Sequence, residues 1–130
     1  MHWKIENGEL AGPIDFGAEL ADVKDMIGDP SDQFKRTLDS DDVVYAYDDK
    51  GIHLSIGADG KLSQLIVFPE NEVFIGTTQL LGKTIESVYS ELNAAGIEVE
   101  REDTGLWCEK EKAFLVEAEG LVDGVEIYRE

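Results

Sequence analysis

Few residues of this sequence could do catalytic chemistry. It contains two histidines, His2 and His53, and a single cysteine, Cys108. The histidines are isolated from each other, and His53 lies between Ile52 and Leu54, as expected for a residue on a strand. There is no nucleophile elbow, phosphate-binding loop, dinucleotide-binding turn or zinc-binding helix motif. The sequence therefore predicts a protein that is not an enzyme and has neither a metal ion nor a cofactor.

Carboxylates are the abundant reactive groups. Of the 130 residues, 29 are Asp or Glu and 11 are Lys or Arg, which gives a formal net charge of −18. A field of this sign repels phosphates and anionic lipid surfaces, and it speeds encounter with a basic partner. Nucleic-acid binding is disfavoured, because the chain has no basic stripe that could release counterions. Solubility or a salt-rich habitat explains the charge equally well.

The densest acidic segment surrounds a short Val/Tyr segment, Val43–Tyr47, which has the composition of a β-strand. Five aspartates flank it: Asp39, Asp41, Asp42, Asp48 and Asp49. One interpretation is that these aspartates steer and orient a cationic partner, which nearby tyrosines then anchor. The alternative is that they are solvated turn residues.

The elements that must position these residues follow from periodicity and from turn signals. Apolar spacing predicts helices over residues 18–27 and 84–95, which end at Gly28-Asp29-Pro30 and at Gly96. Alternation and glycine-containing turns predict strands over residues 34–38, 43–47, 52–56, 62–68, 97–101, 105–108, 113–118 and 122–128.

Two halves of the chain resemble each other. Gly17 aligns with Gly82, and at that offset the apolar positions of the two helices coincide. After a shorter loop, Tyr47 aligns with Trp107, and residues 54–60 align with residues 114–120. A helix, a turn and a closing strand therefore recur in the same order, which predicts an internal repeat.

The predicted fold is α+β, in a single domain of residues 1–130. Repeat one spans about residues 10–68 and repeat two about residues 75–128. Each repeat supplies one helix and an antiparallel meander. The two meanders form one sheet with both helices on one face, and the other face is open to water.

Strand alternation divides the side chains between the two faces of this sheet. The expected core face carries Val44, Ala46, Leu54, Ile56, Leu65, Val67, Leu106, Cys108, Phe114, Val116, Val125 and Ile127. The expected open face carries Tyr45, Tyr47, His53, Ser55, Gln64, Ile66, Trp107, Glu126 and Tyr128. Acidic residues at the strand ends, which include Glu109 and Glu111, would form a rim. A single bulge would invert this assignment and bury the aromatic rings.

The cellular compartment follows from cysteine usage and from the N-terminus. The single cysteine excludes an internal disulfide and suits a reducing cytosol. Residues 1–8 lack the apolar core of a signal peptide, and no apolar run is long enough to cross a membrane. The expectation is a cytoplasmic protein that does not bind membranes.

Two segments carry a resemblance to known proteins. Phe16-Gly17 followed by Ile27-Gly28-Asp29-Pro30, and Leu81-Gly82 followed by Leu92, open the two helix-plus-meander units. This arrangement resembles beta-lactamase inhibitory protein and related tandem-repeat domains, and it is similar to small acidic immunity proteins with which bacteria neutralise toxins. The resemblance implies an open, aromatic-rich sheet face that grips a target enzyme. The chain lacks the paired cysteines of the secreted inhibitors, which argues against secretion and against a beta-lactamase target.

The leading hypothesis is a monomeric or weakly dimeric immunity protein that occludes the active site of a basic toxin domain, possibly a nuclease. The alternative is a small-molecule or cation-binding module, or a weak enzyme, that uses the open sheet face. The expected partner-binding residues are Tyr45, Tyr47, Trp107, Asp41, Asp42, Asp48, Asp49, His53, Glu109 and Tyr128.

Overall fold

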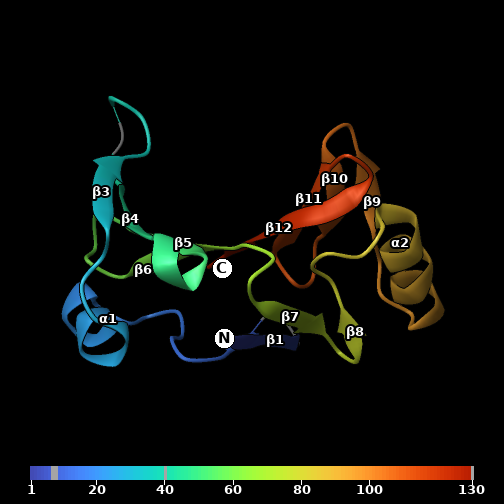
Figure 1. Ribbon diagram of the computed structural model, residues 1–130, viewed down its shortest axis with the longest axis horizontal. Helices are drawn as coiled ribbons and strands as arrows, with labels where there is room; N and C mark the ends of the chain where they lie inside the picture. The colour runs from blue at the N-terminus through green and yellow to red at the C-terminus, as the bar shows by residue number, and fades with distance from the viewer. Residues whose placement is uncertain (7–8, 40, 130) are drawn as a thin grey trace.

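The computed structural model describes residues 1–6, 9–39 and 41–129. Its main element is an eight-stranded antiparallel sheet with the order β3-β4-β5-β6-β12-β11-β10-β9. In Figure 1 the sheet forms a broad trough, with β3 and β4 in one wall and β10 and β11 in the other. The strands are β3 (Asp32–Lys35), β4 (Val43–Tyr47), β5 (Ile52–Ile56), β6 (Leu62–Val67), β9 (Glu100–Glu102), β10 (Gly105–Cys108), β11 (Ala113–Ala118) and β12 (Leu121–Tyr128).

The sheet is joined in the middle by strands that are far apart in the sequence. β6 and β12 pair antiparallel, with Val67 opposite Val125 and Leu65 opposite Ile127. Four consecutive strands lie on each side of this seam. The side chains at the centre of the trough therefore come from both halves of the chain.

A second, four-stranded sheet lies below the seam in Figure 1 and was not predicted from the sequence. Within it, β1 pairs parallel with β7, and Trp3 lies opposite Val73. The two predicted meanders do share one sheet, and this second sheet is an addition to the predicted fold. The strands, in spatial order, are β2 (Glu9–Ala11), β1 (His2–Glu6), β7 (Glu72–Ile75) and β8 (Thr78–Gln79).

Both predicted helices are present. α1 (Leu20–Ile27) begins at Glu19, which forms a reciprocal capping box with Asp22. It ends at Gly28, whose positive φ of 86° stops the helix where the sequence predicted. Only Val23 is buried within it, so the helix presents one narrow apolar stripe to the core.

α2 (Ile85–Ala94) begins at Thr84, whose hydroxyl accepts a hydrogen bond from the Ser87 N–H at 3.3 Å. Its buried residues are Ile85, Val88 and Leu92, at helical spacing. The helix is tied to the sheet by Arg101 of β9. The Arg101 guanidinium donates to both carboxylate oxygens of Glu86 at 2.8 and 2.7 Å.

One hydrophobic core joins these elements. It contains side chains from α1, α2, both sheets and the connecting segments, including Trp3, Val23, Tyr47, Leu65, Val88 and Leu115. Burial of this much apolar surface is the main stabilising term for a domain of this size. The face of the eight-stranded sheet that points into this cluster is called the core face below.

Candidate functional site

The opposite face of the eight-stranded sheet is called the open face below. In Figure 1 neither α1 nor α2 lies between the two walls of the trough. Register and alternation assign its side chains. They include Phe34 and Arg36, Val44 and Ala46, His53 and Ser55, Gln64 and Ile66, Glu126 and Tyr128, Phe114 and Val116, Trp107, and Glu100 and Glu102.

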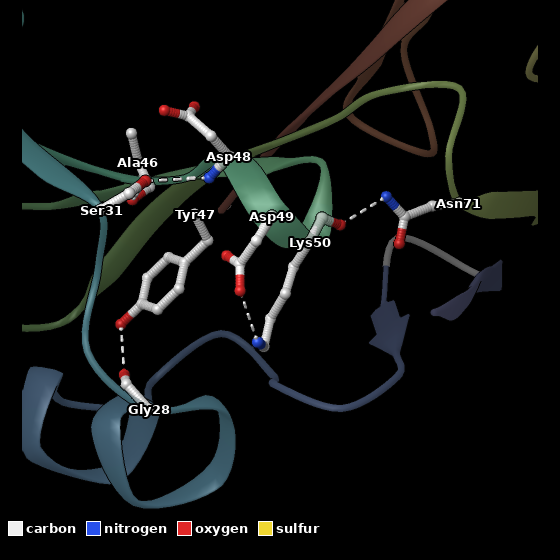
Figure 2. Close-up of polar contacts among 8 residues, drawn as sticks. All are labelled: Gly28, Ser31, Ala46, Tyr47, Asp48, Asp49, Lys50 and Asn71. Atoms are coloured by element: carbon white, nitrogen blue, oxygen red, sulfur yellow. Dashed lines mark hydrogen bonds and ion pairs between the residues drawn. The ribbon is translucent and has the colours of Figure 1, made fainter.

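The predicted placement of Tyr45 and Tyr47 on the open face is wrong. Tyr45 lies opposite Leu54 and packs against the core, and Tyr47 lies opposite Ile52 and is fully buried. The Tyr47 hydroxyl donates to the Gly28 carbonyl oxygen at 2.9 Å, as Figure 2 shows. Burial, reinforced by Asp29, raises the Tyr47 pKa. Both tyrosines therefore pack on the core face, and the buried Tyr47 ring is not accessible to a partner.

The faces of β4 and β11 were both predicted one residue out of phase. Val44 and Ala46, expected in the core, lie opposite Ser55 and His53 on the open face. Phe114 and Val116 also belong to the open face. The core position on β11 is occupied by Leu115, which lies opposite both Leu106 and Val125. In a strand, a shift of one residue exchanges the two faces completely.

The predicted inward direction of Leu106 and Cys108 is confirmed, and both are buried in the core. Burial, with the nearby Glu111, raises the pKa of the Cys108 thiol to about 12. A thiol with this pKa is protonated at neutral pH and is a poor nucleophile.

The acidic turn that follows β4 is a short 3-10 helix, Asp48–Lys50, shown in Figure 2. Ser31 links it to β4, because the Ser31 hydroxyl accepts from the Asp48 N–H at 3.0 Å and donates to the Ala46 carbonyl at 2.9 Å. The Asp49 carboxylate contacts the Lys50 ammonium at 3.2 Å. The turn therefore holds Asp48 in a fixed position at the end of the strand.

Asn71 fixes the other side of the same turn (Figure 2). Its buried amide donates to the carbonyls of Lys50 and Gly51, both at 3.0 Å. Its carbonyl oxygen accepts from the Trp3 indole N–H at 3.4 Å. One side chain thus joins the acidic turn to the four-stranded sheet.

The open face contains two hollows. The central hollow has a volume of about 340 Å³ and lies over the seam. Its polar centre is Arg36, whose guanidinium donates to the Ser55 hydroxyl at 2.7 Å and to the Gln64 side-chain oxygen. Asp42 lies 3.7 Å from the same guanidinium. Arg36 was not predicted as a site residue, because nothing in the local sequence marks an arginine just after an edge strand as functional.

Aromatic side chains form the walls of the central hollow. His53 lies between Phe34 and Phe68, with ring centroids at 6.3 and 5.0 Å. The His53 Nε2 lies 3.3 Å from Asp48 Oδ1, so the acidic turn orients the imidazole. Phe34 is 45% exposed, which is unusual for a phenylalanine and is typical of contact surfaces.

Tyr128 closes the central hollow on its other side. Its hydroxyl donates to Glu126 Oε1 at 2.7 Å. Burial and this carboxylate raise the Tyr128 pKa to about 12, so the phenol stays protonated at physiological pH. Its ring lies 6.1 Å from that of Trp107, edge to face, and this pair separates the two hollows.

The outer hollow lies beyond Trp107 and has a volume of about 580 Å³. It is lined by Glu102, Asp103, Thr104, Trp107 and Phe114. The Trp107 indole N–H donates to Glu109 Oε2 at 3.0 Å, and Lys112 lies 3.4 Å from the same carboxylate. The indole ring is therefore held in one orientation. Of the five residues that line the hollow, only Trp107 was predicted to bind a partner.

The predicted acidic rim is formed only in part. Asp41 and Asp48 are exposed, and Asp42 and Glu109 are paired with Arg36 and Lys112. Glu111, expected in the rim, is 8% exposed instead. Its Oε1 is the one buried side-chain polar atom of the described residues without a hydrogen-bond partner. Burial raises the pKa of the Glu111 carboxyl above its ordinary value.

Two searches of the described part of the chain were negative. No group of three or more His, Cys, Asp and Glu residues within it is placed to hold a metal ion. No helix within it has the length and apolarity needed to span a membrane. Compared with models of protein families, with curated proteins and with solved structures, the chain has no match.

Proposed function

We propose that this protein is a non-enzymatic inhibitor that binds a basic protein on its open face, as an immunity protein binds a toxin. The observation that carries the proposal is the combination of a trough-shaped open face, walls of aromatic side chains and a net charge of −18. Aromatic residues supply rigid contact area at low entropic cost, and complementary charge speeds association.

The architecture supports this proposal. Consecutive strands β3 to β6 and β9 to β12 mirror each other across the seam, and each set follows one helix. We infer a tandem duplication whose two helices lie on the core face, because Val23, Val88 and Leu92 belong to the same core as Leu54 and Leu115. A duplicated platform of this kind presents one wide surface that is supported from behind.

The proposed partner is a basic toxin domain, possibly a nuclease, whose active site the open face occludes. Carboxylates would take the place of substrate phosphates, and aromatic rings would take the place of stacked bases. The free thiol of Cys108 favours a bacterial cytoplasm as the compartment, and charge repulsion favours a monomer.

The proposal is tested by capture followed by inhibition. The immobilised chain is exposed to a lysate of the source cells at low and high salt, and each retained basic protein is purified and assayed. The expected result is one partner whose activity is lost at a 1:1 ratio with the chain. Capture without inhibition would contradict the proposal.

Matched variants locate the binding surface. Trp107→Ala should raise the dissociation rate of the partner, because it removes a central aromatic contact. Asp48→Asn should lower the association rate at low salt, because it removes a charge at the open face. Asp25→Asn, an equal change of charge on exposed α1, is the control. Equal effects of Asp48→Asn and Asp25→Asn would refute steering by this face.

A second candidate is supported by the central hollow alone. Its volume of about 340 Å³ suits a small molecule, and Arg36 could pair with a carboxylate. A panel of small carboxylic acids and metal ions, scored by the rise in Tm, separates the two proposals, since a bound ligand stabilises the folded state. A specific rise that Arg36→Met abolishes would favour the small-molecule module.

A further inference from the structure

We propose that the outer hollow is a binding site for a single arginine side chain. The starting observation is that two carboxylates and two aromatic rings line the hollow, with no lysine or arginine among its residues. Glu102 and Asp103 are exposed, and within the described residues their side chains take part in no hydrogen bond or ion pair.

The hollow is held in shape by the strands beneath it. Glu102 lies opposite Gly105, and Asp103 and Thr104 form the two-residue turn between them. The Thr104 carbonyl accepts from the Glu117 N–H at 2.9 Å, which ties this turn to β11. The backbone that carries the two carboxylates is therefore fixed beside the rings and is not a free loop.

The two rings are also fixed. Trp107 is held by Glu109 at 3.0 Å. Phe114 lies over Gly105, where a Cβ atom would come within 3.2 Å of the Phe114 Cζ. Because position 105 carries no side chain, the ring can lie against the backbone. The rings are thus preorganised, which lowers the entropic cost of stacking a ligand on them.

An aromatic ring and a carboxylate together bind an arginine elsewhere in this molecule. On the core side of β9, the Arg101 guanidinium lies 4.0 Å from the centroid of the Tyr89 ring. It also donates two hydrogen bonds to Glu86, at 2.8 and 2.7 Å. The outer hollow repeats the ring and the carboxylate on the open side of the same strand, without the arginine.

The occupant must then come from a partner. Arginine fits better than lysine, because its planar guanidinium can stack on an indole or phenyl ring while it donates two parallel hydrogen bonds to a carboxylate. The source of this arginine rests on the proposed function, since a basic protein partner would supply it. The site itself can be tested without that partner.

The test uses N-acetyl-arginine methylamide as the probe, with N-acetyl-lysine methylamide as the comparison. The readout is the backbone amide spectrum together with the Trp107 indole N–H signal. Trp3 is buried and serves as an internal control. The expected result is a saturable shift that is confined to Trp107, Phe114 and the turn at residues 103–104. The lysine probe should bind several times more weakly.

Variants complete the test. Glu102→Gln combined with Asp103→Asn should weaken probe binding by about tenfold, as loss of a charged hydrogen-bonding pair predicts. The Tm should be unchanged, because these carboxylates stabilise nothing in the fold. Asp25→Asn should leave binding as it is. Shifts spread over the whole acidic surface, or equal binding of the two probes, would overturn the inference.

The probe-binding test of the arginine site and the capture test of the proposed function can fail independently of each other. If the probe binds in the outer hollow but no basic protein is captured and inhibited, the arginine site stands and the inhibitor proposal fails. If a basic protein is captured and inhibited but the arginine probe does not bind in the outer hollow, the inhibitor proposal stands and the arginine site fails.

Discussion

The central and outer hollows lie on one face of one sheet, yet their polar groups are in opposite states. In the central hollow Arg36 is bonded to Ser55 and Gln64, His53 is oriented by Asp48, and Tyr128 donates to Glu126. In the outer hollow the described carboxylates of Glu102 and Asp103 have no such partner. Groups that are satisfied internally maintain a shape, whereas groups that are left unpaired are available to a ligand.

The largest expected effect concerns the backbone beneath the outer hollow. A Cβ atom at Gly105 would lie 1.9 Å from the Leu115 carbonyl oxygen, so Gly105→Ala must displace β10 from β11. We expect a loss of about 3 kcal/mol or more in the free energy of unfolding, measured with urea.

The control for this change is Gly124→Ala on β12. The nearest atom to a Cβ there is the Val67 carbonyl oxygen at 3.7 Å, which is an ordinary contact. Its effect should stay within about 0.5 kcal/mol. Equal losses for the two variants would mean that Gly105 has no special role in shaping the hollow.

The next effect tests whether the central hollow is held together internally. Arg36→Met should cost about 2 kcal/mol, because it leaves the buried Ser55 and Gln64 side chains without their charged donor. Glu102→Gln, in the outer hollow, should change the free energy of unfolding by less than about 0.5 kcal/mol. If the two changes were equally costly, the contrast between the hollows would be refuted.

Glu111 shows what an unpaired carboxyl does when it is buried. Its pKa is raised above the ordinary value of 4.5 by burial. The folded protein therefore binds this proton more tightly than the unfolded chain does. The resulting stabilisation is present below pH 4.5 and is lost as the pH rises through the raised pKa.

Glu111→Gln removes this titration. The variant should gain about 1 kcal/mol over the unchanged protein at neutral pH, and the gain should shrink as the pH is lowered towards 4. Thermal unfolding from pH 4 to pH 8 measures it, with exposed Glu102→Gln as the control. A gain that does not change with pH would argue against a raised pKa at Glu111.

The smallest expected change in stability distinguishes a core-face residue from an open-face residue. Tyr47→Phe should cost about 1 kcal/mol, because the Gly28 carbonyl loses its donor inside the structure. Trp107→Phe should cost less, since part of the indole faces solvent and a ring remains against Tyr128. The reverse order of stabilities would place Trp107 in the core and weaken the proposed binding face.

The hairpins of the eight-stranded sheet were predictable, because their signals are local. Four strands, Val43–Tyr47, Ile52–Ile56, Gly105–Cys108 and Ala113–Ala118, have the predicted bounds. The turn between the first two of these strands is closed by Gly51, which has a φ of 66° and a left-handed conformation. In the turn between the other two strands, Lys112 has the positive φ, at 52°. A strand between two such turns is defined within a few residues of sequence.

The directions of the side chains were less predictable. On β4, Val44 and Ala46 are nearly as buried as Tyr47, although they belong to opposite faces. On β11, Phe114, Leu115 and Val116 are all apolar. When both faces of a strand are apolar, the period of two no longer tells which face meets the core. Trp107 and His53 were placed correctly, because each alternates with apolar core neighbours.

The four-stranded sheet could not be predicted from local sequence patterns. β1 and β7 pair in parallel across a separation of about 70 residues, and β8 has only two residues. Arg36, Phe114 and Glu102 were likewise missed as site residues, because they come together only through the sheet order. A hollow assembled from several strands is a property of the topology and not of any single segment.

The seam between β6 and β12 has a consequence for how the chain folds. β6 cannot complete its pairing until β12 has been synthesised, and the segment between them forms the rest of the four-stranded sheet, α2 and the strands β9 to β11. Until β12 pairs with it, the edge of β6 that faces away from β5 exposes a row of unpaired backbone groups beside an apolar surface. Refolding should be slow for a domain of this length, and a stalled nascent chain should be prone to pair with its own copies.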